Sequence, residues 1–272
     1  MKILPFFLSF ILVGIETDCW GQYNCEVVFE KNSPCCKACE MLYRDTKGRR
    51  EGVQGARESI MVCDSAIALC PDFAEPYYIK AIPYLKRGEF WKWKPIIDKA
   101  VECDTVEYIG YRGGARFMFL RDYGGAIADI EWLKSRNVPV GTIYNGDYSL
   151  ECILALSYRG MGDTLKAIEI LQKHVLSERR GYYDYYHLGV MLFQVNRPHE
   201  AEEVLRRQIS LYPFADAYYY IALAYRNMFD YRAFADNMKR AHECYENGIC
   251  LPGSGSYMDY PDKIYLKQIH NL

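Results

Sequence analysis

The fold of this chain is decided by residues 182–214, which read YYDYYHLGVMLFQVNRPHEAEEVLRRQISLYPF, and by residues 215–243, which read ADAYYYIALAYRNMFDYRAFADNMKRAHE. Apolar or small side chains recur in the first stretch at Tyr185, Leu188, Gly189, Leu192, Ala201, Leu205 and Pro213. The same order returns 33 residues later at Tyr218, Ile221, Ala222, Tyr225, Phe234 and Met238. The chain therefore contains a unit that is repeated in tandem.

The spacing within each unit is typical of two amphipathic helices. Side chains that lie about three, four or seven residues apart share one face of a helix. Neither helix can bury its apolar face alone, so the two are expected to pack against each other and against the next unit. Gly189 and Ala201 are small, which predicts a close crossing of the two helices, and Pro213 ends the second helix.

This order of residues resembles the tetratricopeptide repeat, although the spacing is one residue short of the usual 34. The resemblance implies an all-α, right-handed superhelical solenoid of antiparallel helix pairs. Units are expected at residues 40–73 (degenerate), 74–106, 107–140, 148–181, 182–214 and 215–248, and a loop with a C-terminal capping helix at 249–272.

An insertion interrupts the array at residues 137–147. The equivalent alanines on either side, Ala126 and Ala167, are 41 residues apart instead of about 34. The insertion contains Pro139, Gly141 and an Asn145-Gly146 turn, which predict a loop. Insertions of this kind project from one face of an array and often carry function.

The composition excludes one class of partner. The formal net charge is −2 over 272 residues, so the chain has no electrostatic reason to bind nucleic acid, whose partners usually carry a basic face. The 25 tyrosines combine an apolar ring with a polar tip, which suits both packing between helices and a binding surface.

Residues 1–21 have the features of a secretory signal peptide. An apolar run extends from Ile3 to Ile15, and Cys19 and Gly21 are small residues that precede a cut at Gln22. The run is short for a membrane-spanning helix, so we expect no transmembrane span in the mature chain. We expect export to the periplasm or cell surface of a bacterium; an uncleaved anchor, a buried N-terminal helix and lipidation of Cys19 are the alternatives.

Cysteines are frequent for a chain of this length. There are 11, and an even number remains after loss of Cys19, which favours disulfides in an exported protein. Residues 22–39 form a Cys-rich segment, and Cys244 and Cys250 flank a short loop where we expect a disulfide. Cys36 and Cys39 have the spacing of a redox dithiol, which leaves thiol–disulfide exchange as an alternative function.

Motifs for catalysis or for metal binding are not found in the sequence. The histidines are scattered, and neither paired metal ligands nor a nucleotide-binding or nucleophile motif occurs. We therefore assign no metal site, no cofactor and no catalytic residue, and expect a protein that is not an enzyme.

The resemblance also indicates which side chains face the concave side of the solenoid. Carried over position by position, it places there six tyrosines and two arginines: Tyr78, Tyr108, Tyr111, Arg159, Tyr183, Tyr186, Tyr219 and Arg226. Exposed aromatic rings and arginines are enriched in binding surfaces, so we expect this surface to bind a protein or peptide segment of unknown identity. The rings of Tyr78, Tyr111, Tyr186 and Tyr219 are expected to be partly exposed there. The alternatives are a carbohydrate-binding accessory protein of the cell envelope, and tyrosines that simply pack between helices.

Overall fold

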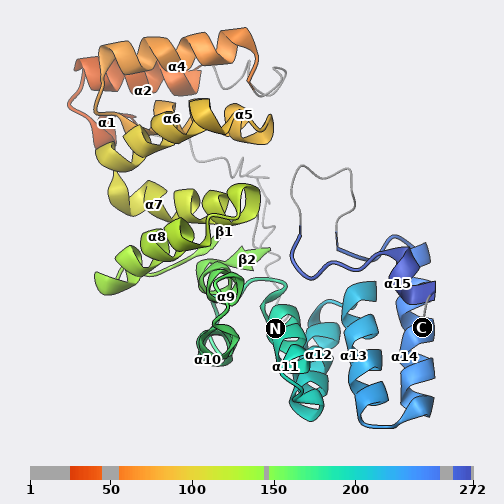
Figure 1. Cartoon of the computed structure of the whole chain (residues 1–272). Coiled ribbons are helices and arrows are strands. Elements are labelled where there is room, and N and C mark those ends of the chain that lie inside the picture. Colours follow the sequence, from red (N-terminus) through yellow and green to blue (C-terminus); the bar gives the residue numbers. More distant parts are fainter. Residues whose placement is uncertain (1–24, 45–54, 144–146, 252–259, 271–272) are drawn as a thin grey trace, which may run out of the picture.

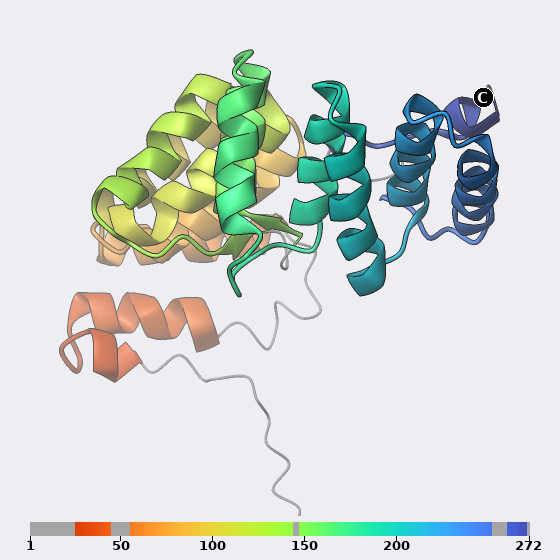
Figure 2. The same cartoon turned by 90° about the horizontal axis from the view of Figure 1, so that it is seen from below.

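The computed structural model of the chain describes residues 25–44, 55–143, 147–251 and 260–270. The expected signal peptide at residues 1–21, including Cys19, lies outside the described residues. Within them, helices follow one another along an arc that carries the N-terminal helices at one end and the C-terminal helices at the other (Figure 1; Figure 2 shows the same arc from below). No helix of this described part is long and apolar enough to cross a membrane.

Consecutive helices pack as antiparallel pairs, and each pair packs against the next. The pairs are α2 (Pro34–Arg44) with α4 (Arg57–Leu69), α5 (Ala74–Lys86) with α6 (Phe90–Cys103), α7 (Thr105–Ala115) with α8 (Tyr123–Ser135), α9 (Leu150–Gly160) with α10 (Thr164–His174), α11 (Asp184–Gln194) with α12 (Pro198–Leu211), and α13 (Ala215–Asn227) with α14 (Tyr231–Glu246). The shorter elements are α1 (Cys25–Val28), the π-helix η1 (Arg116–Leu120), β1 (Thr142–Ile143), β2 (Tyr148–Ser149) and α15 (Leu266–His270). The predicted all-α, right-handed solenoid is confirmed.

Side-chain caps begin several of these helices. Each capping side chain accepts a hydrogen bond from the backbone amide three residues further on, as seen at Asp104, Asp122, Ser149, Asp163 and Asp230. A cap of this kind satisfies one of the free amides of the first turn and stabilises the helix by about 1 kcal/mol. These caps therefore fix where the chain re-enters a helix after each turn.

The close helix crossing predicted from the sequence is confirmed at Gly189. A Cβ atom added to this glycine would lie 2.4 Å from Cγ of Leu205, so α11 and α12 approach too closely for any larger residue. Ala201 is fully buried in the same helix pair. The small residues thus set the spacing of the two helices.

The first helix pair is held by disulfides. Cys25–Cys39 joins α1 to α2, and Cys35–Cys70 joins α2 to the residue that follows α4. Helix α2 begins at Pro34, before the boundary expected at residue 40, and therefore takes up part of the Cys-rich segment. This pair has its own apolar cluster, separate from the main core that extends from α5 to α13.

The structure contradicts one alternative and one prediction about cysteines. Cys39 is bonded to Cys25 while Cys36 is buried with a free thiol, so the redox dithiol of the alternative reading does not form. The expected disulfide between Cys244 and Cys250 is also absent, and both thiols are free. Between them the chain turns at Gly248, and the amide of Ile249 donates to the Cys244 carbonyl at 2.8 Å.

The chain beyond α14 does more than cap the array. Helix α15 packs on α14, as expected for a capping helix. Before α15, however, residues 260–264 lie beside the middle of the array, in contact with Asp147 and with α11 (Figure 1). The backbone amides of Leu251 and Ile264 donate to the carboxylate of Asp216 on α13, at 3.0 and 2.8 Å. Residues 260–264, which we name the C-terminal segment, therefore lie against the inner face.

Candidate functional site

A cavity of about 860 Å³ lies on the inner face of the N-terminal half of the array; we name it the inner-face cavity. Its walls come from α5, α7, η1, α8 and α9, from residues 138–142 of the insertion and from Tyr260. Three predicted site residues line it together, since the ring of Tyr78 lies 5.1 Å from that of Tyr108 and 4.8 Å from that of Tyr111. Its volume lies within the range of about 300–1,000 Å³ that is usual for ligand sites.

The charges around the inner-face cavity are mostly negative. The ionisable side chains that line it besides the tyrosines are Glu75, Glu107, Asp147 and Lys86. The hydroxyl of Tyr108 donates to Glu75. Burial raises the pKa of Tyr78, and the charges of Glu75 and Glu107 raise it further. Aromatic rings beside carboxylates form an environment that favours a cation over an anion.

The π-helix η1 gives this part of the array two different walls. Phe119 lines the inner-face cavity, whereas Phe117 and Met118 line a second hollow beside the C-terminal segment. A π-helix changes the direction in which successive side chains point, and such turns are frequent at functional sites. As a result, Phe119 lines the inner-face cavity, and Phe117 and Met118 line the adjoining hollow.

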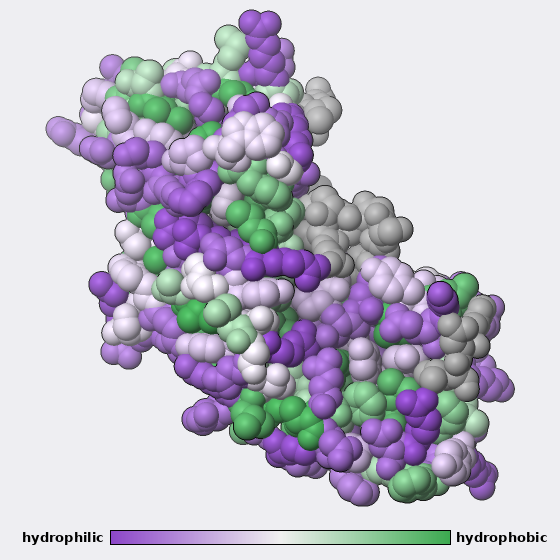
Figure 3. Space-filling model, in the orientation of Figure 1, coloured by the Kyte–Doolittle hydropathy of each residue, from purple (hydrophilic) through white to green (hydrophobic). Residues whose placement is uncertain are grey.

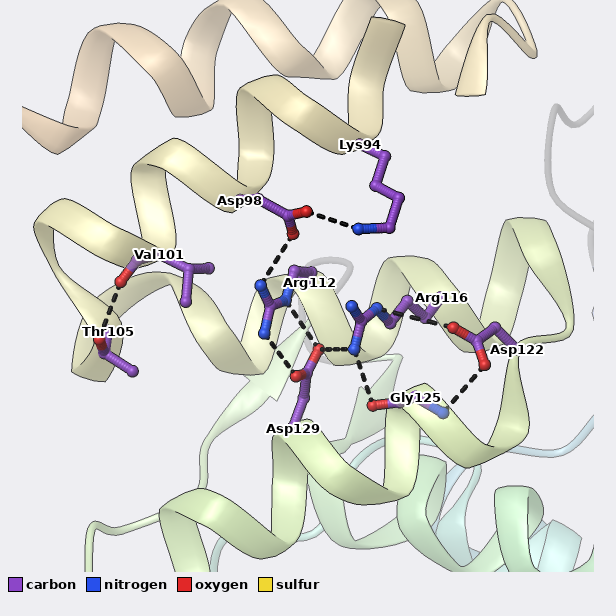
Figure 4. A network of polar contacts seen from close by, with 9 residues as sticks. All are labelled: Lys94, Asp98, Val101, Thr105, Arg112, Arg116, Asp122, Gly125 and Asp129. Carbon is purple, nitrogen blue, oxygen red and sulfur yellow. Dashed lines mark hydrogen bonds and ion pairs between the residues drawn. The ribbon is translucent and has the colours of Figure 1, made fainter. Parts of the chain in front are cut away.

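An ion network fixes η1 to its neighbours (Figure 4). Arg112 of α7 binds Asp129 of α8 through two nitrogens, at 3.0 and 2.7 Å, and reaches Asp98 of α6 at 2.8 Å. Arg116, the first residue of η1, contacts Asp129 at 3.0 Å. The side chain of Asp129 is only 4% exposed. One buried carboxylate thus ties α7, η1 and α8 together, and charge-assisted bidentate pairs of this kind are geometrically specific.

The insertion forms part of the inner-face cavity. Val138, Pro139, Gly141 and Thr142 line it, and β1 pairs with β2 through Thr142 and Ser149. The sequence predicts a loop on one face at this place, and the structure puts its described residues beside the predicted tyrosines.

A glycine brings α9 close to the same cavity. A Cβ atom on Gly110 of α7 would lie 2.8 Å from Cδ1 of Leu150, the first residue of α9. Both residues line the inner-face cavity. The glycine therefore lets α9 close the cavity against α7.

The C-terminal segment occupies the next part of the inner face. Arg159 binds the carboxylate of Asp262 with its Nη1 atom at 2.9 and 3.0 Å, and His187 donates from Nδ1 to the same carboxylate at 2.8 Å. The hydroxyl of Tyr186 donates to the Asp262 backbone carbonyl at 2.5 Å. Two predicted site residues, Arg159 and Tyr186, are therefore brought together, but their contacts are with the chain itself.

The expectation that the rings of Tyr186 and Tyr219 are partly exposed is wrong. They are 0% and 7% exposed, because the C-terminal segment and α15 cover this half of the inner face. Burial raises the pKa of Tyr219, and the positive charge of the predicted Arg226 acts in the opposite direction. Burial also raises the pKa of Tyr183 to about 12, and its ring packs edge-on against Phe214 at 5.5 Å.

A buried cluster of Ser149, Asp184 and His174 contains the residue types of a hydrolase triad in a different order. The Ser149 hydroxyl donates to Asp184 at 2.6 Å, and the His174 ring lies 3.3 Å from the same carboxylate oxygen. The histidine is therefore beyond the aspartate and does not face the hydroxyl, whereas a triad needs it next to the nucleophile. Ser149 also accepts from the amide of Cys152 as the cap of α9, so the cluster holds β2 to its neighbours.

Two residues of the inner face have no role in the repeat pattern. Asp262 and His187 make the central contact of the C-terminal segment, yet neither stands at a position that the repeat register assigns to the concave side. The sequence instead predicts that Asp262 lies in the first turn of the capping helix, whereas α15 begins only at Leu266 in the structure.

Comparison with known proteins agrees with the fold. Residues 185–214 match the tetratricopeptide repeat model. Among solved structures, the chain is similar to PilW, a widely conserved type IV pilus biogenesis factor, with 11% identity, 79% of this chain and 95% of that chain covered, and a TM-score of 0.61. It is also similar to MamA (21% identity, 62% and 95% covered, TM-score 0.52) and to YrrB, a tetratricopeptide repeat protein with an unusual peptide-binding site (20% identity, 68% and 93% covered, TM-score 0.51). No curated protein matches the sequence. The chain therefore contains a tetratricopeptide repeat at residues 185–214 and has the fold of tetratricopeptide repeat solenoids.

Proposed function

We propose that this protein is a non-catalytic scaffold that binds a segment of a partner protein in the inner-face cavity. The observation that carries the proposal is the joint aromatic wall of Tyr78, Tyr108 and Tyr111, which lines a cavity of about 860 Å³. Pockets that combine apolar and aromatic walls with a few placed polar groups are typical binding sites. The likeness to YrrB, a tetratricopeptide repeat protein with an unusual peptide-binding site, supports a peptide as the ligand.

The partner segment brings a lysine or arginine into this cavity. Glu75, Glu107 and Asp147 outnumber Lys86 in its lining, and tyrosine rings stand beside them. A cation over an aromatic face is stabilised by about 0.5–1 kcal/mol at exposed sites and by more when it is desolvated. An acidic side chain would meet both the carboxylates and the negative faces of the rings.

The protein acts after export from a bacterial cytoplasm. Two disulfides, Cys25–Cys39 and Cys35–Cys70, support this because disulfides persist in oxidising compartments. The signal peptide expected at residues 1–21 points in the same direction. The alternative of thiol exchange through Cys36 and Cys39 loses its support, since Cys39 is bonded to Cys25 and Cys36 is 1% exposed.

The test is selection from a displayed library of random peptides with the wild-type protein. Peptides rich in lysine or arginine are expected, and Tyr111→Ala is expected to weaken their binding by about 2 kcal/mol, roughly thirtyfold in Kd. Tyr231→Ala is the matched control, because this tyrosine is 63% exposed on α14 and does not line the cavity. Circular dichroism verifies that each variant is folded.

A second variant separates loss of binding from loss of fold. Glu107 is exposed and its side chain lines the cavity, so Glu107→Gln keeps the shape and removes one charge. Basic peptides are expected to bind it several-fold more weakly. Selected peptides that bind wild type, Tyr111→Ala and Glu107→Gln equally would contradict the proposal. Retention of glycans without any peptide would favour the carbohydrate-binding alternative instead.

A further inference from the structure

The C-terminal segment is held like a bound peptide, by one side-chain anchor and by its backbone. The anchor is Asp262, whose side chain is 7% exposed and contacts Arg159 and His187. Its backbone carbonyl accepts from Tyr186, and the backbone amide of Ile264 donates to Asp216. Contacts to backbone atoms can be made by a segment of any sequence, whereas the buried site for the Asp262 carboxylate requires an acidic residue. Grooves that recognise extended segments usually combine both kinds of contact.

The groups that hold Asp262 require a negative partner. The side chain of His187 is 0% exposed and that of Arg159 is 19% exposed. Water therefore has little access to these two groups and cannot readily take the place of the Asp262 carboxylate as their hydrogen-bond acceptor. Removing one partner of a buried charged pair leaves the other charge without compensation, which is strongly unfavourable. Any other occupant of this site must therefore bring a carboxylate of its own.

The segment also adjoins the inner-face cavity. Tyr260 lines that cavity, donates to Asp147 at 3.3 Å, and packs 6.2 Å from the ring of Tyr148. Tyr148 in turn stacks on His187 at 5.4 Å. The negative cavity and the positive site around Arg159 are therefore neighbouring parts of one surface, and the chain itself occupies the second part.

We infer that Arg159, His187 and Tyr186 form a second subsite of the groove, specific for an aspartate of the partner segment, and that the C-terminal segment occupies it as an exchangeable intramolecular ligand. The inference rests on the proposed function and extends it: the partner segment combines a basic residue for the inner-face cavity with an aspartate for this subsite. In the free protein the C-terminal segment weakens binding of the partner segment. The partner binds only molecules whose subsite is open, so its apparent affinity falls in proportion to the fraction of molecules in that form.

The test uses a fluorescein-labelled peptide with the sequence of residues 260–270 as the probe, and fluorescence anisotropy as the measurement. Asp262→Ala in the full chain removes the intramolecular anchor, so the peptide is expected to bind this variant at least tenfold more tightly than it binds wild type. The same peptide with asparagine in place of its aspartate is expected to lose at least tenfold in affinity for Asp262→Ala. Asp236→Ala, which removes an exposed aspartate of α14, is expected to behave as wild type.

Each other outcome overturns the inference. A folded Asp262→Ala variant that binds the peptide no better than wild type would make the C-terminal segment a fixed part of the fold. Loss of helicity in both Asp262→Ala and the isosteric Asp262→Asn would lead to the same conclusion, because an exchangeable ligand is not needed for folding. A wild-type dimer in sedimentation that disappears in Asp262→Ala would assign the subsite to a second copy of the chain.

This test is independent of the open cavity. Tyr111→Ala in the background of Asp262→Ala is expected to leave binding of the probe within twofold, since the segment is held at Asp262 and Ile264 by Arg159, Tyr186, His187 and Asp216. Failure of the basic-peptide selection together with binding of the probe would therefore refute the proposed function of the cavity and retain the aspartate subsite.

Discussion

Gly189 controls the spacing of a whole helix pair through one missing methyl group. A Cβ atom there would lie 2.4 Å from Cγ and 2.7 Å from Cδ2 of Leu205, and Leu205 is itself fully buried. We predict that Gly189→Ala lowers the free energy of unfolding by about 1–3 kcal/mol, because overpacking forces side chains or backbone to shift. Urea denaturation followed by circular dichroism measures the change.

The control for Gly189 is another helical glycine that has space around it. Gly124 of α8 is exposed, and a Cβ atom there would meet nothing within 4 Å. Gly124→Ala is therefore expected to leave stability unchanged or to raise it by up to about 1 kcal/mol, since alanine reduces the freedom of the unfolded chain. If both substitutions change the free energy of unfolding equally, the close contact with Leu205 does not decide the effect at Gly189.

At the scale of elements, the C-terminal segment is fastened by a titratable group. Burial acts to raise the pKa of Asp262, but the hydrogen bond from His187 and the charge of Arg159 outweigh it and hold the pKa below its usual value. A carboxyl with a lowered folded-state pKa stabilises the protein above its unfolded pKa of about 3.9 and loses this contribution as the pH falls through the folded value. We therefore predict that the stability difference between wild type and Asp262→Asn is full at pH 5 and shrinks below pH 4.

Urea denaturation of both proteins at about pH 5, 4 and 3 measures this difference. Other buried carboxyls, such as Asp216 with its pKa raised by burial, are common to the two proteins and cancel in the comparison. The nearby Tyr148 and Tyr220 have raised pKa values and stay neutral over this range. A difference that stays constant or widens on acidification would show that the charge of Asp262 does not hold the segment.

The repeat pattern of the sequence predicts some contacts between elements and not others. The helix pair α11–α12 is predictable because Gly189 meets Leu205 within one repeat unit, where local spacing determines the contact. The inner-face position of Tyr186 follows from the same register. Its burial does not, because the covering residue, Asp262, is 76 positions away and no repeat relates the two.

The π-helix η1 is equally invisible to periodicity. Arg116 and Asp129 hold it through a contact between two helices, and neither residue departs from a normal helical sequence. The sequence therefore predicts which helices form the inner face. It does not predict that the inner-face cavity is open while the C-terminal segment covers the next part, because that depends on contacts between residues far apart in the sequence.

At the scale of the whole molecule, the array has apolar clusters that follow one another along the chain. The cluster of α2 and α4 is distinct from the main core, and a third cluster lies around α13, α14 and the residues near α15. In repeat arrays each unit contacts mainly its neighbours, so a local loss of stability spreads only a short way. The first pair, with its disulfides, is the unit on which this can be tested.

We predict that reduction of the disulfides opens α2 and α4 before the rest of the array. Cys35–Cys70 closes a loop of 35 residues, and a cross-link of that length contributes about 3–4 kcal/mol in the chain-entropy model. Hydrogen exchange measured with and without reductant is expected to show faster exchange of the backbone amides of α2 and α4, while those of α11 and α13 keep their protection. The double variant Cys35→Ser/Cys70→Ser without reductant should reproduce the pattern, which excludes an effect of the reagent. If α11 and α13 lose protection as strongly as α2 and α4, the array unfolds as one cooperative unit, and the first pair is no separate module.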